Sequence, residues 1–219
     1  MNETKKNIDD VVIIDTDSWK KDLPILARKQ IEIFDIVSDT HPMLRSVLPD
    51  FDFVNATVDP NTFASSMVET CKKHNGLGLS ANQCGFNHRM FVMGSGENYV
   101  AFFNPKILST SESITKMEEG CLSFMDLFLS IERPNTIEVE YQDFNGVVRK
   151  INFTGLTARC FQHEVDHLNG IVYTMHMKPL ALQSAYNKRL KLAKKRNKLQ
   201  TTMINKVKEQ FNANKFRAD

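Results

Sequence analysis

Phe-Gln-His-Glu-Val-Asp-His-Leu, residues 161–168, is the stretch that decides the fold of this chain. It contains the pattern His-Glu-x-x-His. On an α-helix, residues four apart lie nearly above one another, so His163 and His167 present their imidazoles on one face. Neutral imidazole is a common ligand for divalent transition metals. Glu164 is placed to exchange a proton with a metal-bound water. The stretch therefore predicts a metal-binding helix.

The alternative interpretation of this stretch is an ordinary helix with a solvated polar face. Against it, residues 156–168 are mostly apolar apart from the two His, the Glu and one Arg of this segment. Leu156, Cys160, His163 and His167 form a stripe at i, i+4, i+7 and i+11. Such a stripe is typical of an inward face. Because buried imidazoles need partners, a metal that satisfies both is the favoured interpretation.

The distribution of charge divides the chain into two parts. The 219 residues suffice for one globular domain with appendages, and the composition is ordinary, with 42% hydrophobic and 25% charged residues. Of the 28 basic and 26 acidic residues, 11 and 2 fall in residues 181–219, a local charge of +9; the other 17 and 24 give −7. An acidic body with a basic tail indicates a polyanionic partner for the tail.

The cysteines and the apolar runs indicate a reducing, cytoplasmic compartment. There is no Cys-x-x-Cys pair, so thiols are expected as ligands or core residues rather than in disulfides. Residues 11–14 are too short an apolar run for a signal peptide, and no run approaches the ~18 residues that span a bilayer. The four cysteines are Cys71, Cys84, Cys121 and Cys160.

Periodicity and turn signals predict an α+β fold, with antiparallel β-sheets around the central metal helix. Residues 1–30 are expected to be an N-terminal extension, and Asp59 and Pro60 are expected to begin a helix over 60–75. Residues 76–85 are expected to form a glycine-spaced loop, and a basic amphipathic helix is expected over 179–219. Strands are expected at 31–37, 89–93, 99–108 with a bend at 104–105, 136–141 and 147–153, the last two joined at Asn145-Gly146.

A catalytic metal usually has three protein ligands, and the third is not obvious from the helix. Downstream, Tyr173 stands where a metzincin has His, which leaves only His176 and the distant Glu209. Upstream, residues 119–123 read Glu-Gly-Cys-Leu-Ser, and a thiolate binds Zn, Fe, Co or Ni well. Taken alone, Cys121 is a buried thiol at least as often as a ligand.

Three motifs together resemble the peptide deformylases. They are Gly-Leu-Gly-Leu-Ser-Ala-Asn-Gln at 76–83, the Glu-Gly-Cys-Leu-Ser strand at 119–123 and Gln-His-Glu-Val-Asp-His-Leu at 162–168, in the order of that family. The resemblance covers residues 31–178, the expected catalytic domain. It implies removal of the N-formyl group from the initiator methionine of nascent peptides, with release of formate.

The resemblance also implies a role for each motif residue. Cys121, His163 and His167 would bind one divalent metal, typically Fe(II), with Zn, Ni or Co able to replace it. Glu164 would be the general acid and base. The oxyanion would be stabilised by Gln83 and the Leu122 backbone N–H. Substrate would be bound by Leu77, Gly78, Gly120, Leu156 and Cys160, with Leu122 also lining the methionine pocket and Met117 a weaker candidate.

Two positions after the cysteine motif bear on this resemblance. Residues 124–129 are mostly apolar, and Phe128 stands where many members have an Arg that approaches the substrate, so substrate recognition beyond the first residues is expected to differ. Arg133 is interpreted either as a partner of Glu119 or as a surface residue.

The basic tail resembles the C-terminal helix with which bacterial-type deformylases dock at the ribosome, which would place its cations on rRNA phosphates. The alternative is a solvated helix that packs on the body by its leucine stripe. Two rival functions are a metallopeptidase or other metal-dependent amidase and a non-enzymatic RNA-binding homologue. The expected location is a bacterial or host cytoplasm, and an organelle also fits. The tail cations are Lys188, Arg189, Lys191, Lys194, Lys195, Arg196 and Lys198.

Overall fold

The computed structural model describes residues 31–215, with side chains up to residue 206, so the expected extension at 1–30 lies outside the described residues. The helices are α1 Pro60–Lys73, α2 Gly155–Leu168 and α3 Pro179–Lys215, with short 3-10 helices at Pro42–Arg45, Ala81–Cys84 and Tyr173–His176. The strands are β1 Gly78–Ser80, β2 Met90–Ser95, β3 Asn98–Thr110, β4 Ile114–Glu119, β5 Leu129–Pro134, β6 Thr136–Gln142 and β7 Val148–Thr154.

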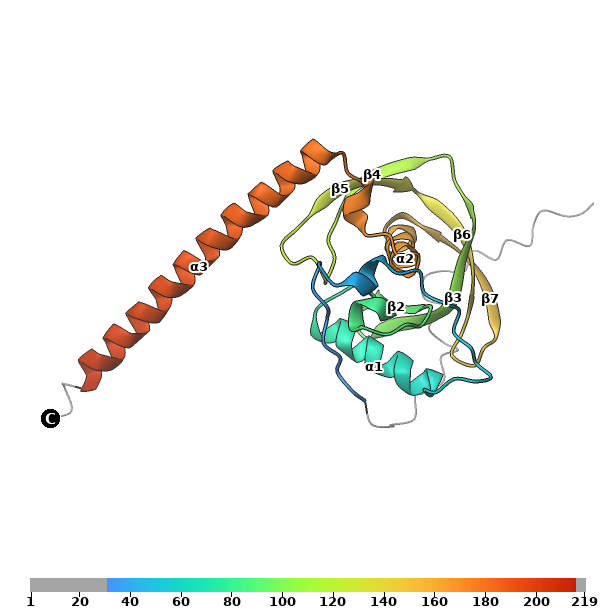
Figure 1. Cartoon of the computed structure of the whole chain (residues 1–219), viewed down its shortest axis with the longest axis horizontal. Helices are drawn as coiled ribbons and strands as arrows, with labels where there is room; N and C mark the ends of the chain where they lie inside the picture. Colours follow the sequence, from blue (N-terminus) through green and yellow to red (C-terminus); the bar gives the residue numbers. More distant parts are fainter. Residues whose placement is uncertain (1–30, 216–219) are drawn as a thin grey trace, which may run out of the picture.

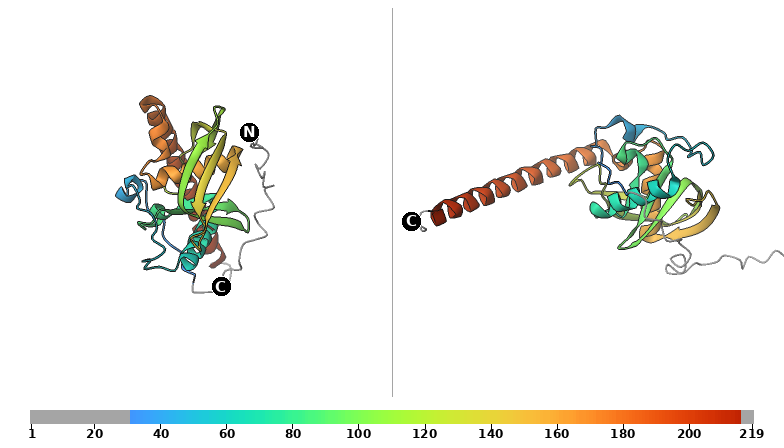
Figure 2. Two further views of the ribbon diagram at one scale, coloured as in Figure 1. Left: turned by 90° about the vertical axis from the view of Figure 1, so that its right-hand side faces the viewer. Right: turned by 90° about the horizontal axis from the view of Figure 1, so that it is seen from below.

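The metal-motif helix α2 lies between two antiparallel sheets (Figures 1 and 2). One sheet has the order β1-β2-β3-β6-β7, and the other is the hairpin β4-β5. The apolar face of α2 packs on the larger sheet, where Phe161 contacts the rings of Phe91 and Phe102. The predicted α+β class with antiparallel sheets around this helix is therefore confirmed.

Helix α1 begins where the sequence predicts. The Asp59 carboxylate accepts a hydrogen bond from the Thr62 backbone N–H at 2.8 Å, and Pro60 occupies the first turn. Its buried stripe includes Phe63, Met67 and Cys71, which pack under β1 and β2. The helix ends at Lys73, two residues before the predicted end.

The predicted strand at 31–37 is wrong. This segment is extended, but it pairs with no strand within residues 31–215. Its backbone is held instead by side chains of α1: the Glu32 N–H donates to Ser66 Oγ at 3.1 Å and the Phe34 N–H to Thr70 Oγ1 at 3.0 Å. The alternating sequence correctly predicts an extended conformation here, but it does not predict which groups the extended backbone pairs with.

Two further assignments change. Residues 76–85 are not only a loop, because they contain β1, paired with β2, and a 3-10 helix. Residues 120–123 are not a strand: β4 ends at Glu119 and the chain turns, with the Phe124 N–H donating to the Cys121 carbonyl. The turn places Cys121 beside α2.

The hairpin β4-β5 was not predicted from the sequence. In β5 alternate side chains point inward, and they are Leu129, Ile131 and Arg133. Because the third inward position carries a charge, the period-two apolar pattern that marks a strand is broken. By contrast, the predicted hairpin at Asn145-Gly146 is confirmed between β6 and β7, and the predicted bend in β3 appears as a register shift between Phe103 and Lys106.

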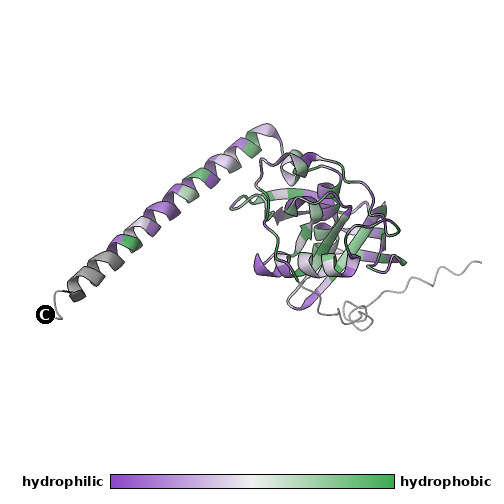
Figure 3. Ribbon diagram, turned by 60° about the horizontal axis from the view of Figure 1, so that its bottom comes forward, coloured by the Kyte–Doolittle hydropathy of each residue, from purple (hydrophilic) through white to green (hydrophobic). Residues whose placement is uncertain are grey.

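Helix α3 extends away from the body for most of its length, with polar residues dominating its surface (Figures 1 and 3). Its first turns pack on the body, where Leu182, Ala185 and Tyr186 lie beside Tyr173, and Arg196 farther along forms an ion pair with Asp126. The described side chains from 194 to 206 are exposed, including Leu199 and Met203. The leucine stripe thus does not pack on the body beyond the first turns. Among the described residues, no helix is long and apolar enough to cross a membrane.

Candidate active site

The three candidate metal ligands meet although they come from two distant segments. The ligand atoms of Cys121, His163 and His167 all lie within 4.8 Å of one another, and they are the one such group among the described residues. Cys121 Sγ lies 3.3 Å from His167 Nε2. Helix α2 supplies the two imidazoles four residues apart, and the turn after β4 supplies the thiol. The upstream cysteine, and not a downstream residue, completes the group.

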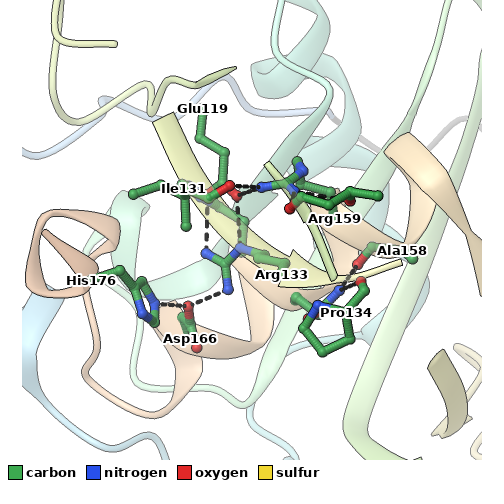
Figure 4. A network of polar contacts seen from close by, with 11 residues as sticks. Glu119, Ile131, Arg133, Pro134, Ala158, Arg159, Asp166 and His176 are labelled. Carbon is green, nitrogen blue, oxygen red and sulfur yellow. Dashed lines mark hydrogen bonds and ion pairs between the residues drawn. The ribbon is translucent and has the colours of Figure 1, made fainter. Parts of the chain in front are cut away.

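A buried carboxylate, Glu119, orients His163 and is itself held by Arg133 and Arg159, the two arginines that Figure 4 shows beside it. Its Oε2 lies 3.1 Å from His163 Nδ1, which directs Nε2 of that imidazole toward the other ligands. Its two oxygens also accept from Arg133 at 2.7 and 3.0 Å, and Oε1 accepts from Arg159 at 2.6 Å. Arg133 is therefore a buried partner of Glu119, which decides between the two interpretations of this residue.

The network continues from Arg133 to the molecular surface. Arg133 Nη1 donates to Asp166 Oδ2 at 2.8 Å, and His176 Nε2 lies 2.8 Å from the same oxygen (Figure 4). Burial opposes ionisation of Glu119, but hydrogen bonds with His163 and Arg133 outweigh it and hold the pKa of Glu119 well below its usual range. A permanent negative charge therefore lies behind the His163 ring, as is usual for metal-bound histidines.

The two imidazoles have opposite titration behaviour. Burial disfavours the charged form of His163, but hydrogen bonds with Cys121 and Glu119 outweigh burial and raise its pKa to about 10. Burial, together with the charge of His163, holds the pKa of His167 well below the ordinary value. Since an imidazole must be neutral to bind a metal, metal binding at neutral pH releases the proton of His163.

Glu164 is buried beside the ligand group and has a free acceptor. Its Oε2 has no hydrogen-bond partner among the described residues. Burial raises the pKa of Glu164 to about 7, against an opposing effect from His163. A carboxyl group with a pKa near neutrality can both accept and return a proton, which is what general acid–base catalysis requires.

The 3-10 helix after β1 aims a side-chain amide at the same point. Gln83 Oε1 accepts from the Ser80 N–H at 2.9 Å and from Ser80 Oγ at 3.0 Å. With its oxygen held in this way, Gln83 Nε2 points toward Cys121 Sγ and Ser123 Oγ, 3.3 Å from each. The arrangement places an N–H donor beside the candidate metal position.

The donor set fits one divalent transition metal. Cys and His ligands of a tetrahedral Zn²⁺, at 2.3 and about 2.0–2.1 Å, lie about 3.4–3.6 Å apart. The observed 3.3 Å between Cys121 Sγ and His167 Nε2 is close to that spacing. A thiolate with two imidazoles suits Zn, Fe, Co or Ni and does not suit Mg²⁺ or Ca²⁺.

A cavity of about 970 Å³ leads to this group. All the predicted site residues line it except the buried His167. Met117, the weaker candidate for the methionine pocket, does not line it either. Three residues of the predicted stripe of α2, Leu156, Cys160 and His163, line this cavity. Leu156 is half-exposed, whereas His163 and His167 are buried as the stripe predicts. The predicted residues on the wall are Leu77, Gly78, Gln83, Gly120, Cys121, Leu122, Leu156, Cys160, His163 and Glu164.

Gly78 approaches the Glu164 carboxylate closely. A Cβ built on Gly78 would collide with Glu164 Oε1 and lie 2.9 Å from Cys160 Sγ. Any side chain at this position would therefore push against Glu164, and the absence of one keeps the backbone of β1 at the cavity wall.

Phe128, which stands where many members of the resembled family have a substrate-approaching Arg, lines the cavity. Two other lining residues were not predicted from the sequence: Met125 in the turn after the cysteine, and Arg189 of α3, which forms a 2.8 Å ion pair with Asp39. The exposed apolar residues of the segment 124–129 were visible in the sequence. Arg189 carried no local signal, because its position depends on where α3 begins.

Comparison with known proteins gives one consistent result. A family model described as polypeptide deformylase matches residues 33–183. A peptide deformylase of Rhizobium meliloti is 36% identical over 160 residues, which cover 71% of this chain and 91% of that protein. The crystal structure of peptide deformylase from Thermotoga maritima matches with a TM-score of 0.64 and 36% identity, over 68% of this chain and 99% of that one. A Met-Ala-Ser-bound class I type b peptide deformylase from Acinetobacter baumannii matches with a TM-score of 0.63 and 28% identity, over 66% and 98% of the chains.

Proposed function

Because this chain belongs to the peptide deformylase family, we propose that the cavity beside α2 is its active site and that the residues of the three motifs act there. The chain is a metal-dependent hydrolase that removes the N-formyl group from the N-terminal methionine of newly made peptides. The observation that carries the site assignment is the convergence of Cys121, His163 and His167, within 4.8 Å, at the cavity that Glu164 also lines.

Cys121, His163 and His167 hold the metal, and Glu119 orients His163 by its 3.1 Å contact with Nδ1. A divalent ion in this position supplies Lewis acidity, which makes water nucleophilic at neutral pH and polarises the formyl carbonyl. We propose Fe(II) as the natural ion, with Zn, Ni or Co as replacements. A thiolate beside Fe(II) is readily oxidised, so the iron form should lose activity in air.

Glu164 moves the protons of the reaction. In its ionised form, Oε2 accepts a proton from the attacking water, and the protonated carboxyl group then delivers it to the leaving amine. The buried Oε2 has no other hydrogen-bond partner among the described residues, so it is available for this exchange. The amine nitrogen is a poor leaving group unless it is protonated. The second proton transfer is therefore as necessary as the first.

The developing oxyanion is stabilised by Gln83 Nε2 and by the backbone N–H of Leu122. The contacts of Gln83 with Ser80 fix its amide before the substrate arrives, so little reorganisation is needed in the transition state. Gly78 offers its backbone to the peptide. The apolar wall at Leu77, Leu122, Leu156 and Cys160, with Gly120 at its edge, receives the methionine side chain.

The test of this proposal is formate release from formyl-Met-Ala by anaerobically purified protein, with metal content measured. Wild type, Glu164→Ala and the control Glu132→Ala are compared; Glu132 is an exposed residue of β5 outside the cavity. Formate from wild type and the control, with Glu164→Ala inactive but still holding its metal, supports the proposal. If wild type binds metal but releases no formate, the proposed substrate is refuted. If wild type binds no metal, the proposed ligand set is refuted.

The domain division is part of the proposal: residues 31–178 form the catalytic domain, residues 179–219 form a basic helix, and residues 1–30 precede both. We propose that the helix attaches the enzyme to ribosomal RNA in the cytoplasm, where formylated chains emerge. Arg189 and Arg196 are paired with acids of the body, whereas Lys191, Lys194 and Lys198 are exposed on α3. These lysines are therefore the candidate phosphate contacts.

Cosedimentation with ribosomes tests the attachment. Replacement of Lys191, Lys194 and Lys198 by Gln should reduce ribosome binding and its dependence on salt, while formyl-Met-Ala turnover stays unchanged. A matched triple replacement of body lysines, at Lys106, Lys116 and Lys150, should leave binding intact. Equal binding by both triple variants would refute the role of α3.

A further inference from the structure

The turn that follows the candidate ligand Cys121 holds two apolar side chains, Met125 and Phe128, outward. Phe124 and Leu127 are buried, and the Tyr173 hydroxyl donates to the Leu127 carbonyl at 2.8 Å. These anchors fix the turn at both its beginning and its end. As a result Met125 and Phe128 point away from the core, with 69% and 64% of their surfaces exposed.

Phe128 lies next to the candidate metal centre along the cavity wall. A Cβ built on Gly120 would come within 2.8 Å of Phe128 Cε1, so the ring covers the backbone of Gly120, the residue adjacent to the ligand Cys121. Both Phe128 and Gly120 line the cavity. An aromatic ring held mostly in water at the edge of a cavity is a surface available for burial by a ligand.

Part of the remaining cavity lining is also apolar or neutralised. Leu77 and Leu156 line the same cavity and are 47% and 54% exposed. The two acids nearest the turn do not present bare charges, because Asp126 is paired with Arg196 and Asp39 with Arg189. The lining also includes the exposed charged residues Asp35, Lys73 and Glu118. An apolar preference is therefore expected only where a ligand contacts the apolar wall that contains Phe128.

We propose that Phe128 is a specificity-determining residue that favours an apolar side chain at one of the two residues following formyl-methionine. The inference rests on the proposed function, since it concerns the peptide that enters this cavity. Successive Cα atoms are 3.8 Å apart and an extended chain advances about 3.3–3.6 Å per residue. A ring over Gly120, one residue from Cys121, is thus within reach of the second or third residue of a peptide whose formyl group is at the metal centre.

The preference should be modest, because the ring covers one side of the ligand and does not enclose it. Enclosed apolar pockets discriminate by about 10- to 200-fold. An open aromatic surface is expected to give an about three- to tenfold difference in kcat/KM between the two substrates. The comparison uses Leu and Asn, which are similar in size and uncharged, so that charge effects at the cavity edge do not contribute.

The experiment measures formate release from formyl-Met-Leu-Ala, formyl-Met-Asn-Ala, formyl-Met-Ala-Leu and formyl-Met-Ala-Asn. The readout is the ratio of kcat/KM for Leu over Asn at each position, within each variant, so that a uniform loss of activity or of folded protein cancels. Wild type should show a ratio of about three to ten at one position. Phe128→Ala should bring that ratio close to one, and Phe128→Leu should retain most of it.

Leu108→Ala is the matched control, because Leu108 is an exposed apolar residue of β3 that does not line the cavity. It should keep the wild-type ratio. A ratio near one in wild type at both positions, or the same ratio in wild type and Phe128→Ala, overturns the inference while the deformylase activity stands. If no tripeptide and no formyl-Met-Ala is turned over by wild type, the proposed function itself fails.

Discussion

Replacement of Glu119 by Gln removes the charge on which the buried network behind His163 depends. The Glu119 carboxylate accepts from Arg133 at both oxygens, from Arg159 at Oε1, and contacts His163 at Oε2. Its side chain is only 4% exposed and those of the two arginines are 5% and 3% exposed. A Gln at this position leaves the buried Arg159 without its counter-charge and leaves Arg133 paired with Asp166 alone. It also turns one amide N–H toward hydrogen-bond donors.

The expected loss of stability is about 3–5 kcal/mol, the cost of removing one partner from a buried ion pair. That is a large fraction of the roughly 5–15 kcal/mol by which a protein of this kind is stable. Glu132→Gln is the control on the same hairpin: its 3.2 Å pair with Lys116 is exposed on both sides, so it should cost about 0–1 kcal/mol.

The assay is urea unfolding with a chelator present, so that changes in metal affinity do not enter the comparison. The pH dependence provides a second measurement. Because the pKa of Glu119 is lowered on folding from its ordinary value of 4.5, its stabilisation is fully present above that pH and is lost as the pH falls below it. The difference between wild type and Glu119→Gln should therefore be constant above pH ~5 and shrink in more acidic solution. Equal losses for the Glu119 and Glu132 variants would refute the reasoning.

Three further predictions concern the reaction centre. Cys121→Ala should lose most of its metal on dialysis, measured by metal analysis, yet unfold near the wild-type temperature because Phe124 and Leu127 still anchor the turn; full retention of metal would contradict the ligand set. Gln83→Ala should lower kcat by about 10²–10³-fold with metal retained, and a loss confined to KM would argue against an oxyanion role. Burial raises the pKa of Glu164 to about 7, so kcat/KM should fall as the pH drops below 7 and the base becomes protonated; a flat profile from pH 5 to 7 would contradict that role.

Local patterns determined much of this protein from the sequence alone. The four-residue spacing of His163 and His167 needs only helical geometry, and the cap at Asp59 and the Asn145-Gly146 hairpin need only neighbouring residues. Motifs then predicted the candidate ligands, the carboxylate and part of the cavity wall before any tertiary contact was known. These features are set within a few residues of chain, where side-chain period and turn chemistry are sufficient.

Tertiary structure decided the features whose partners are distant in sequence. Glu119 meets Arg133, Arg159 and His163 across separations of 14, 40 and 44 residues, so the sequence could not decide between an exposed and a buried Arg133. The charge of Arg133, at an inward position of β5, also broke the apolar alternation by which the hairpin β4-β5 could have been predicted. The segment 31–37 was misassigned because its partners are hydroxyl groups of α1. Whether a charge is buried or a backbone is paired depends on which distant segment packs against it. Local periodicity cannot predict that segment, because it depends only on neighbouring residues.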